Sequence, residues 1–150
     1  RSADRIDRLA GGGYAVIDYK TGQPPSAAEV ADGLSPQLPL EALMLRDGAF
    51  EGVAAGPAEV LRYWRTSGAG GQPLKVTDVT GKNADADALA SQAAEGLRRL
   101  IDIYSDAATP YISRPHAEAR AQARGGDYDH LARVKEWSVS ADDDDGEAAA

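Results

Sequence analysis

The sequence predicts an α/β domain, because two pairs of short β-rich segments alternate with segments that carry helix signals. Residues 3–9 and 14–20 form the first pair and flank the glycines at 11–13, the usual sign of a hairpin. Residues 58–66 and 73–79 form the second pair, on either side of a glycine-rich loop. We therefore expect a β-sheet, with helices between and after the two strand pairs.

Two short helices are expected between the strand pairs. Ser26 and Glu29 have the spacing of a capping box, so the first helix should begin directly after Ser26. Pro36 is favoured as the first residue of the second helix, with Ser35 as its N-cap. The backbone amide at a first helical position has no partner within the helix, so proline, which has no amide hydrogen, costs nothing there. This second helix should end before Gly48.

A longer helix is expected over residues 85–104. Its apolar residues follow the three-and-four spacing of a helix that packs against a core, and they are Leu89, Ala93, Leu97, Leu100, Ile101 and Tyr104. Further along, residues 125–137 are a candidate for a last short helix. We assign residues 1–137 to one domain and residues 138–150 to an acidic tail that is expected to be disordered.

Composition excludes several classes of site and leaves nucleic-acid binding open. The chain has no cysteine, which rules out disulfides, thiolate metal sites and cysteine-ligated iron–sulfur clusters within these residues. Five of the negative charges lie in the tail, so the net charge of -8 falls to -3 without them. No apolar run approaches the roughly 20 residues of a membrane span. These features predict a soluble, cytoplasmic protein without a membrane partner.

The hairpin brings two carboxylates together. A three-residue loop at 10–12 would place Ile6 opposite Val16 and, further along, Asp4 opposite Asp18. Opposed strand residues have β-carbons roughly 5 Å apart, and like charges at that spacing destabilise the pair. A bound cation would remove this repulsion, and hard divalent ions prefer carboxylate oxygen.

Lys20 lies on the same face of the strand as both aspartates. An ammonium at this position could orient an attacking water and neutralise a phosphate, or help to take a proton if its pKa were lowered. The simpler alternative is a solvated hairpin face with an ordinary salt bridge. Asp7 falls on the opposite face and is expected to pair with Arg5 or another base.

Another possible nucleic-acid contact lies in the second strand pair. Arg62, Trp64 and Arg65 could stack on bases and bind phosphates, since aromatic and arginine side chains serve single strands together. Strand alternation places Arg62 and Trp64 on one face, so a core tryptophan beside an exposed arginine is an equal alternative. His116 and His130 have no second histidine at ligand spacing and are expected to be structural or solvated.

The segments ADRID, VIDYKTG and QLPLEA resemble the PD-(D/E)XK nuclease domain of the RecB and AddB type, most closely the C-terminal nuclease domain of AddB-like double-strand break repair proteins. The resemblance is specific over residues 3–46. It implies a restriction-endonuclease-like core, in which a central mixed sheet holds the catalytic hairpin and is flanked by helices.

The resemblance also implies the site residues. Asp4 and Asp18 match the two metal-binding aspartates, Lys20 matches the catalytic lysine, and Gln37 matches the glutamine of the family's Q-x-x-x-Y helix. The backbone carbonyl of Tyr19 is a further candidate ligand. The implied activity is a Mg²⁺-dependent or Mn²⁺-dependent DNA exonuclease, working in a helicase-nuclease complex with an AddA-like subunit during repair and recombination.

Three features depart from the family pattern. Glu41 stands where the Q-x-x-x-Y motif has tyrosine, and the cysteines that bind an iron–sulfur cluster are missing. The sequence also starts inside the first catalytic strand, so we expect an N-terminally truncated nuclease domain that lacks its upstream helix and is weak or inactive when isolated. A scaffold that binds DNA or a helicase partner without cutting is the alternative function.

Overall fold

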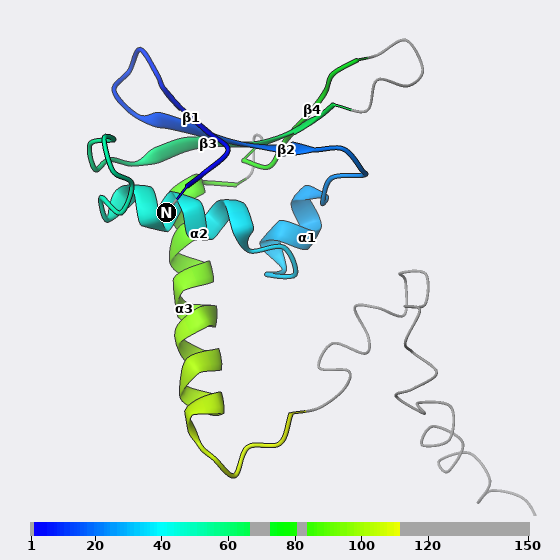
Figure 1. Cartoon of the computed structure of the whole chain (residues 1–150), viewed down its shortest axis with the longest axis vertical. Helices are drawn as coiled ribbons and strands as arrows, with labels where there is room; N and C mark the ends of the chain where they lie inside the picture. The colour runs from blue at the N-terminus through cyan, green and yellow to red at the C-terminus, as the bar shows by residue number, and fades with distance from the viewer. Residues whose placement is uncertain (1, 67–72, 81–83, 112–150) are drawn as a thin grey trace, which may run out of the picture. The chain divides into compact units, whose positions relative to one another are not determined.

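The computed structural model describes residues 2–66, 73–80 and 84–111. Four strands form one sheet in the order of the chain, and they are β1 (Arg5–Arg8), β2 (Tyr14–Lys20), β3 (Ala58–Arg65) and β4 (Lys75–Asp78). The pairs β1/β2 and β3/β4 are antiparallel, whereas β2 and β3 run parallel (Figure 1). Both predicted strand pairs are thus confirmed, and the parallel pairing at the centre makes the sheet mixed.

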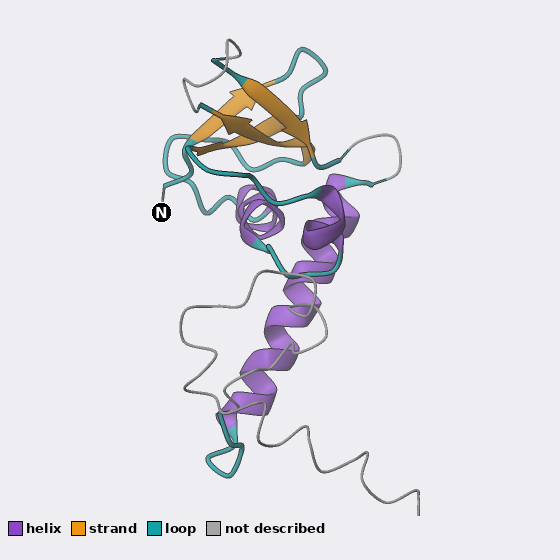
Figure 2. Ribbon diagram, turned by 90° about the vertical axis from the view of Figure 1, so that its right-hand side faces the viewer, coloured by secondary structure: helices purple, strands orange, loops and turns teal. Residues whose placement is uncertain are grey.

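Three helices lie on one side of this sheet (Figure 2). They are α1 (Ala27–Ala31), α2 (Gln37–Arg46) and α3 (Ala86–Ser105). The predicted capping box of α1 is present, with Ser26 and Glu29 exchanging backbone-to-side-chain hydrogen bonds. The predicted start of α2 is wrong by one residue: Pro36 is the N-cap, because its carbonyl accepts the first helical hydrogen bond, 2.9 Å from the amide nitrogen of Leu40.

The core lies between the sheet and the helices. Its central side chains are Val16 and Leu61 from the two parallel strands and Leu38 and Leu45 from α2, all nearly or completely inaccessible to solvent. Leu38 follows directly after the first residue of α2. Burial of these side chains therefore fixes the start of α2 against the sheet, and with it the position of Gln37.

The hairpin has the predicted loop and register. The amide of Leu9 donates to the carbonyl of Gly13 at 2.8 Å, and the amide of Gly12 donates to the carbonyl of Leu9 at 3.0 Å. Gly12 has a φ of 99°, which a residue with a Cβ rarely adopts. Ile6 pairs with Val16 as expected. The glycine turn thereby sets which residues of β1 lie opposite those of β2.

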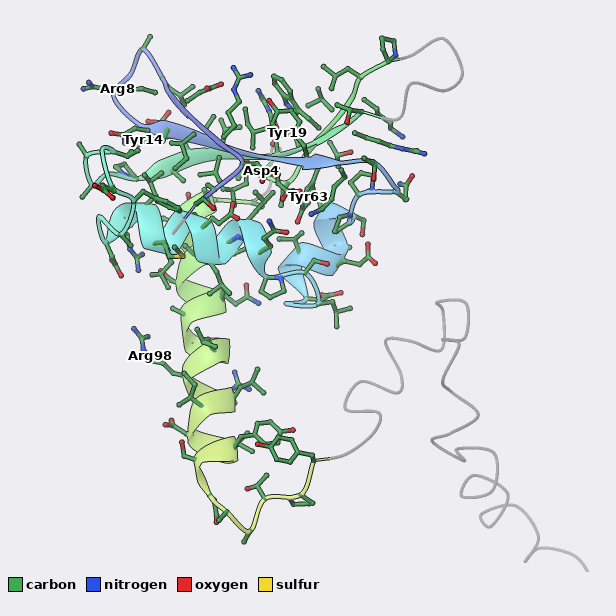
Figure 3. All side chains as sticks on the ribbon, viewed as in Figure 1. Asp4, Arg8, Tyr14, Tyr19, Tyr63 and Arg98 are labelled. Carbon is green, nitrogen blue, oxygen red and sulfur yellow. The ribbon has the colours of Figure 1, made fainter. Side chains whose placement is uncertain are left out.

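Only the first half of α3 packs against the domain. Ala90 and Ala94 are buried, whereas Leu97, Leu100 and Ile101 are 43%, 52% and 55% exposed. Figure 1 shows the second half of α3 extending beyond the sheet and α2. The predicted helix is therefore confirmed, but only the first half of its apolar stripe is buried in the part of the chain that the structure describes. Arg98 projects from α3 into solvent (Figure 3).

The chain divides into two compact units, Arg1–Asp106 and Ala107–Ala150. Only residues 107–111 of the second unit are described. The predicted last helix, both histidines and the boundary at residue 137 lie outside the described residues. Across the described ranges, no helix combines the length and apolar character needed to cross a membrane.

Candidate active site

The C-terminal end of β2 carries a buried carboxylate beside a lysine. Asp18 is 2% exposed and lies on the face of the sheet toward α2, and Nζ of Lys20 lies 2.6 Å from its Oδ2. The predicted convergence of these two side chains is confirmed. The alternative of a solvated face is wrong for Asp18, because α2 covers this carboxylate, whereas the Lys20 side chain remains 31% exposed.

Gln37, the first residue of α2, closes a ring with this pair. Its Nε2 donates to Oδ1 of Asp18 at 2.6 Å, and its Oε1 accepts from Nζ of Lys20 at 3.1 Å. Both oxygens of Asp18 therefore face a nitrogen, and the ammonium is held between a carboxylate and an amide oxygen. The glutamine that the family resemblance implied thus contacts both Asp18 and Lys20.

Asp4 lies directly before β1 at the same end of the hairpin (Figure 3). Its Oδ2 accepts a hydrogen bond from the backbone amide of Tyr19 at 3.0 Å, just beyond the last ladder pair, Arg5 with Ile17. The carboxylate of Asp4 is thus fixed next to the residue that follows Asp18. Binding of one ion by both aspartates remains a prediction, as does ligation by the Tyr19 carbonyl.

Glu41 is a third carboxylate in this group. It follows Gln37 by one helical turn, and Nε2 of Gln37 donates to its Oε1 at 3.2 Å. Burial raises the pKa of Glu41, and the negative charges of Asp18 and Asp4 raise it further, against the lowering effects of Gln37 and Lys20. Sequence reasoning treated this residue only as a departure from a motif, although the spacing of four places it on the same face of α2 as Gln37.

Tyr63 of β3 lies beneath the lysine. Its side chain is 1% exposed, and the Lys20 ammonium lies 5.6 Å from the centre of its ring, within the range of a cation–π contact. Burial, followed by the charges of Asp18, Glu41 and Glu29, raises the pKa of Tyr63 to about 12. The phenol is therefore neutral at physiological pH. The core aromatic of β3 is thus Tyr63, and the alternative of a core tryptophan is wrong.

The opposite face of the sheet carries a separate aromatic cluster. Tyr19 packs edge-on against Trp64 with ring centres 5.8 Å apart, and the Arg5 guanidinium lies 5.0 Å from the Trp64 ring centre. Arg5 also binds Asp7 at 2.9 Å, as predicted.

Two arginines in this region that could bind phosphate already have partners. Arg62, which shares the face of Trp64, pairs with Asp78 at 2.9 Å. Arg65, on the other face of β3, donates to the Gln23 side chain at 3.1 Å. Binding of nucleic acid by Arg62, Trp64 and Arg65 remains a prediction.

The donor atoms of the site suit a hard divalent cation. Oδ2 of Asp18 and Oε2 of Glu41 are buried and accept no hydrogen bond, although Lys20 lies close to the former. Within residues 2–66, 73–80 and 84–111, no three acidic, histidine or cysteine side chains are arranged to hold one metal ion together. Mg²⁺ is commonly bound by one or two carboxylates while keeping several waters, so two aspartates fit that chemistry. The absence of cysteine excludes a cysteine-ligated iron–sulfur cluster in this chain.

Curated proteins from Rickettsia match a short part of the chain. Uncharacterized proteins of Rickettsia conorii and Rickettsia typhi are each 46% identical over 48 residues, and one of Rickettsia bellii is 44% identical over 48 residues. These matches cover 32% of this chain and 6% of each relative, so the chain spans only a small part of their length. No solved structure gives a significant match.

The family comparison covers most of the chain. Residues 2–120 match the PD-(D/E)XK nuclease superfamily, a range that includes the whole sheet, α2 and the ring of Asp18, Lys20 and Gln37. The mixed four-stranded sheet with its helices is consistent with the restriction-endonuclease-like α/β fold that was predicted. By sequence and by architecture, the chain belongs to the PD-(D/E)XK nuclease superfamily.

Proposed function

We propose that the protein hydrolyses phosphodiester bonds in DNA with the help of a divalent metal ion, Mg²⁺ or Mn²⁺. The observation that supports this most directly is the ring of Asp18, Lys20 and Gln37 at the end of β2, with Asp4 fixed beside it. A buried carboxylate, an oriented ammonium and an amide that holds both are a suitable arrangement for chemistry on a charged phosphate.

Each residue has a distinct role in this proposal. Asp4 and Asp18 would hold the cation, with the backbone carbonyl of Tyr19 as a further ligand. When bound, the cation would polarise the phosphate and lower the pKa of a water molecule. Lys20 neutralises charge on the phosphate and orients the attacking water from the partly exposed side of the site. Gln37 holds the side chains of Lys20 and Asp18 in position through one hydrogen bond to each.

We also propose a biological setting on the basis of the hairpin and glutamine-helix motifs. The resemblance of residues 3–46 to RecB and AddB nuclease domains favours an exonuclease that acts on DNA ends in double-strand break repair and recombination. The partner would be an AddA-like helicase subunit, in a cytoplasmic helicase-nuclease complex. If so, degradation of duplex DNA should depend on that subunit and on ATP.

The catalytic proposal is tested by cleavage of end-labelled single-stranded and duplex DNA with Mg²⁺ or Mn²⁺. Asp18→Asn and Lys20→Met should each reduce the cleavage rate by roughly 10²-fold or more. Glu95→Gln, an exposed position on α3, is the control and should cleave at the parent rate. A parent protein that binds DNA without cutting it, with either metal, would instead support the non-cleaving scaffold.

A further inference from the structure

The charges around the end of β2 do not balance. Asp4, Asp18 and Glu41 contribute three negative charges, and the electrostatic influence of both aspartates reaches Glu41. Lys20 supplies one positive charge, so these four groups carry a net charge of -2 when Glu41 is ionised. Part of this group is buried. Unpaired charge in a buried environment is strongly unfavourable. The excess has the size that one divalent cation would neutralise.

Glu41 is the member of this group whose charge lacks a structural explanation. Its Oε1 accepts one hydrogen bond from Gln37, which a neutral amide or hydroxyl oxygen could accept equally well. Its Oε2 is buried and accepts no hydrogen bond in the structure. A carboxylate at this position therefore places a charge in a half-buried site, where one hydrogen bond from Gln37 and the charge of Lys20 are set against burial and the charges of two aspartates.

We propose that Glu41 is a positioning residue that supplies the third negative charge of the cation site, accepting a hydrogen bond from a water molecule of the bound ion. This inference rests on the proposed metal-dependent function. Glu41 acts through a water because no three carboxylates in the described part of the chain are arranged to hold one ion directly. The usual coordination of Mg²⁺, with several retained waters, provides the necessary donors.

Calorimetric titration of the metal-free chain with MgCl₂ tests this proposal. Glu41→Gln keeps an acceptor oxygen for Gln37 but removes the charge, and loss of such an outer-shell partner should weaken Mg²⁺ binding by roughly 10-fold to 100-fold. Glu41→Tyr, which restores the residue of the family motif, should weaken binding to a similar extent. Glu95→Gln removes the same charge from an exposed position of α3 and should bind Mg²⁺ like the parent. Affinity of Glu41→Gln within twofold of the parent would overturn the inference.

Two further measurements separate this inference from the proposed function itself. Asp18→Asn should abolish Mg²⁺ binding; if it does while Glu41→Gln binds normally, only the role of Glu41 is wrong. If Asp18→Asn also binds Mg²⁺ normally, the proposed metal site is wrong as well. In the absence of metal, Glu41→Gln should melt at or above the parent temperature, because it removes a half-buried charge that two nearby aspartates disfavour. A lower melting temperature would contradict the argument from charge.

Discussion

Removing the ammonium of Lys20 should destabilise the metal-free protein more than neutralising its partner Asp18. The Asp18 side chain is 4% exposed and the Lys20 side chain is 31% exposed. In Lys20→Met, Asp18 keeps its charge and its bond from Gln37, but Oδ2 faces no nitrogen and water cannot easily reach it. In Asp18→Asn, the freed ammonium can turn toward solvent.

The magnitude follows from the exposure of the two partners. Breaking a fully buried pair costs about 3–5 kcal/mol and an exposed pair contributes about 0–1 kcal/mol, so a pair with one buried partner should lie between, near 2 kcal/mol. For a chain of this size that corresponds to a melting temperature lower by roughly 4–8 °C. Methionine retains most of the apolar stem, which limits the effect of lost packing.

Urea unfolding of the parent, both single variants and the double variant would measure this effect as a double-mutant cycle. We expect Lys20→Met to be the least stable of the four and the double variant to regain part of the loss. Mg²⁺ should also reduce the loss in Lys20→Met, because a cation replaces the missing charge. If Asp18→Asn were as destabilising as Lys20→Met, the assignment of an uncompensated buried charge to Asp18 would be refuted.

Two other predictions concern the hairpin turn and Glu41. Gly12→Ala should lower the free energy of unfolding by about 1–2 kcal/mol, because φ at this position is 99°. The matched control is Gly11→Ala, since Gly11 has open space around it and no positive φ. Equal effects of the two substitutions in urea titrations would contradict the turn assignment. Burial and the charges of Asp18 and Asp4 raise the pKa of Glu41 above its ordinary value of 4.5. This group's contribution to metal-free stability should therefore fall as pH rises from 4.5 through the folded-state pKa. Melting temperatures across that range should fall less steeply in Glu41→Gln, and parallel curves would speak against the shift.

The strands and the hairpin register could be predicted because they depend on local signals. The glycines at 11–13 and the alternation along residues 14–20 together determine which side chains share the face of Asp18. A family motif identified Gln37 as a site residue, but its contacts with Asp18 and Lys20 were not predicted, since no local pattern relates α2 to β2.

Other features depended on tertiary contacts. The apolar periodicity of α3 shows which face of the helix is apolar, but it does not show which element packs against that face. Burial of the second half of α3 could therefore not be predicted from the sequence. The same holds for Asp18, whose burial requires α2 above it. The motif indicates only that Glu41 replaces a tyrosine, whereas its position one helical turn after Gln37 is what places it beside the site.

The hydrogen bond from the Tyr19 amide to Asp4 has a consequence for mutagenesis. Directly before β1 begins, a side-chain oxygen of Asp4 accepts the hydrogen bond that a backbone carbonyl would otherwise accept, and it terminates the ladder much as an N-cap residue terminates a helix. Alanine at this position would remove a potential metal ligand and fray the end of the hairpin at the same time. Asparagine retains an acceptor for the amide while removing the charge. Asp4→Asn is thus the substitution that reports on the chemistry of Asp4 separately from its structural task.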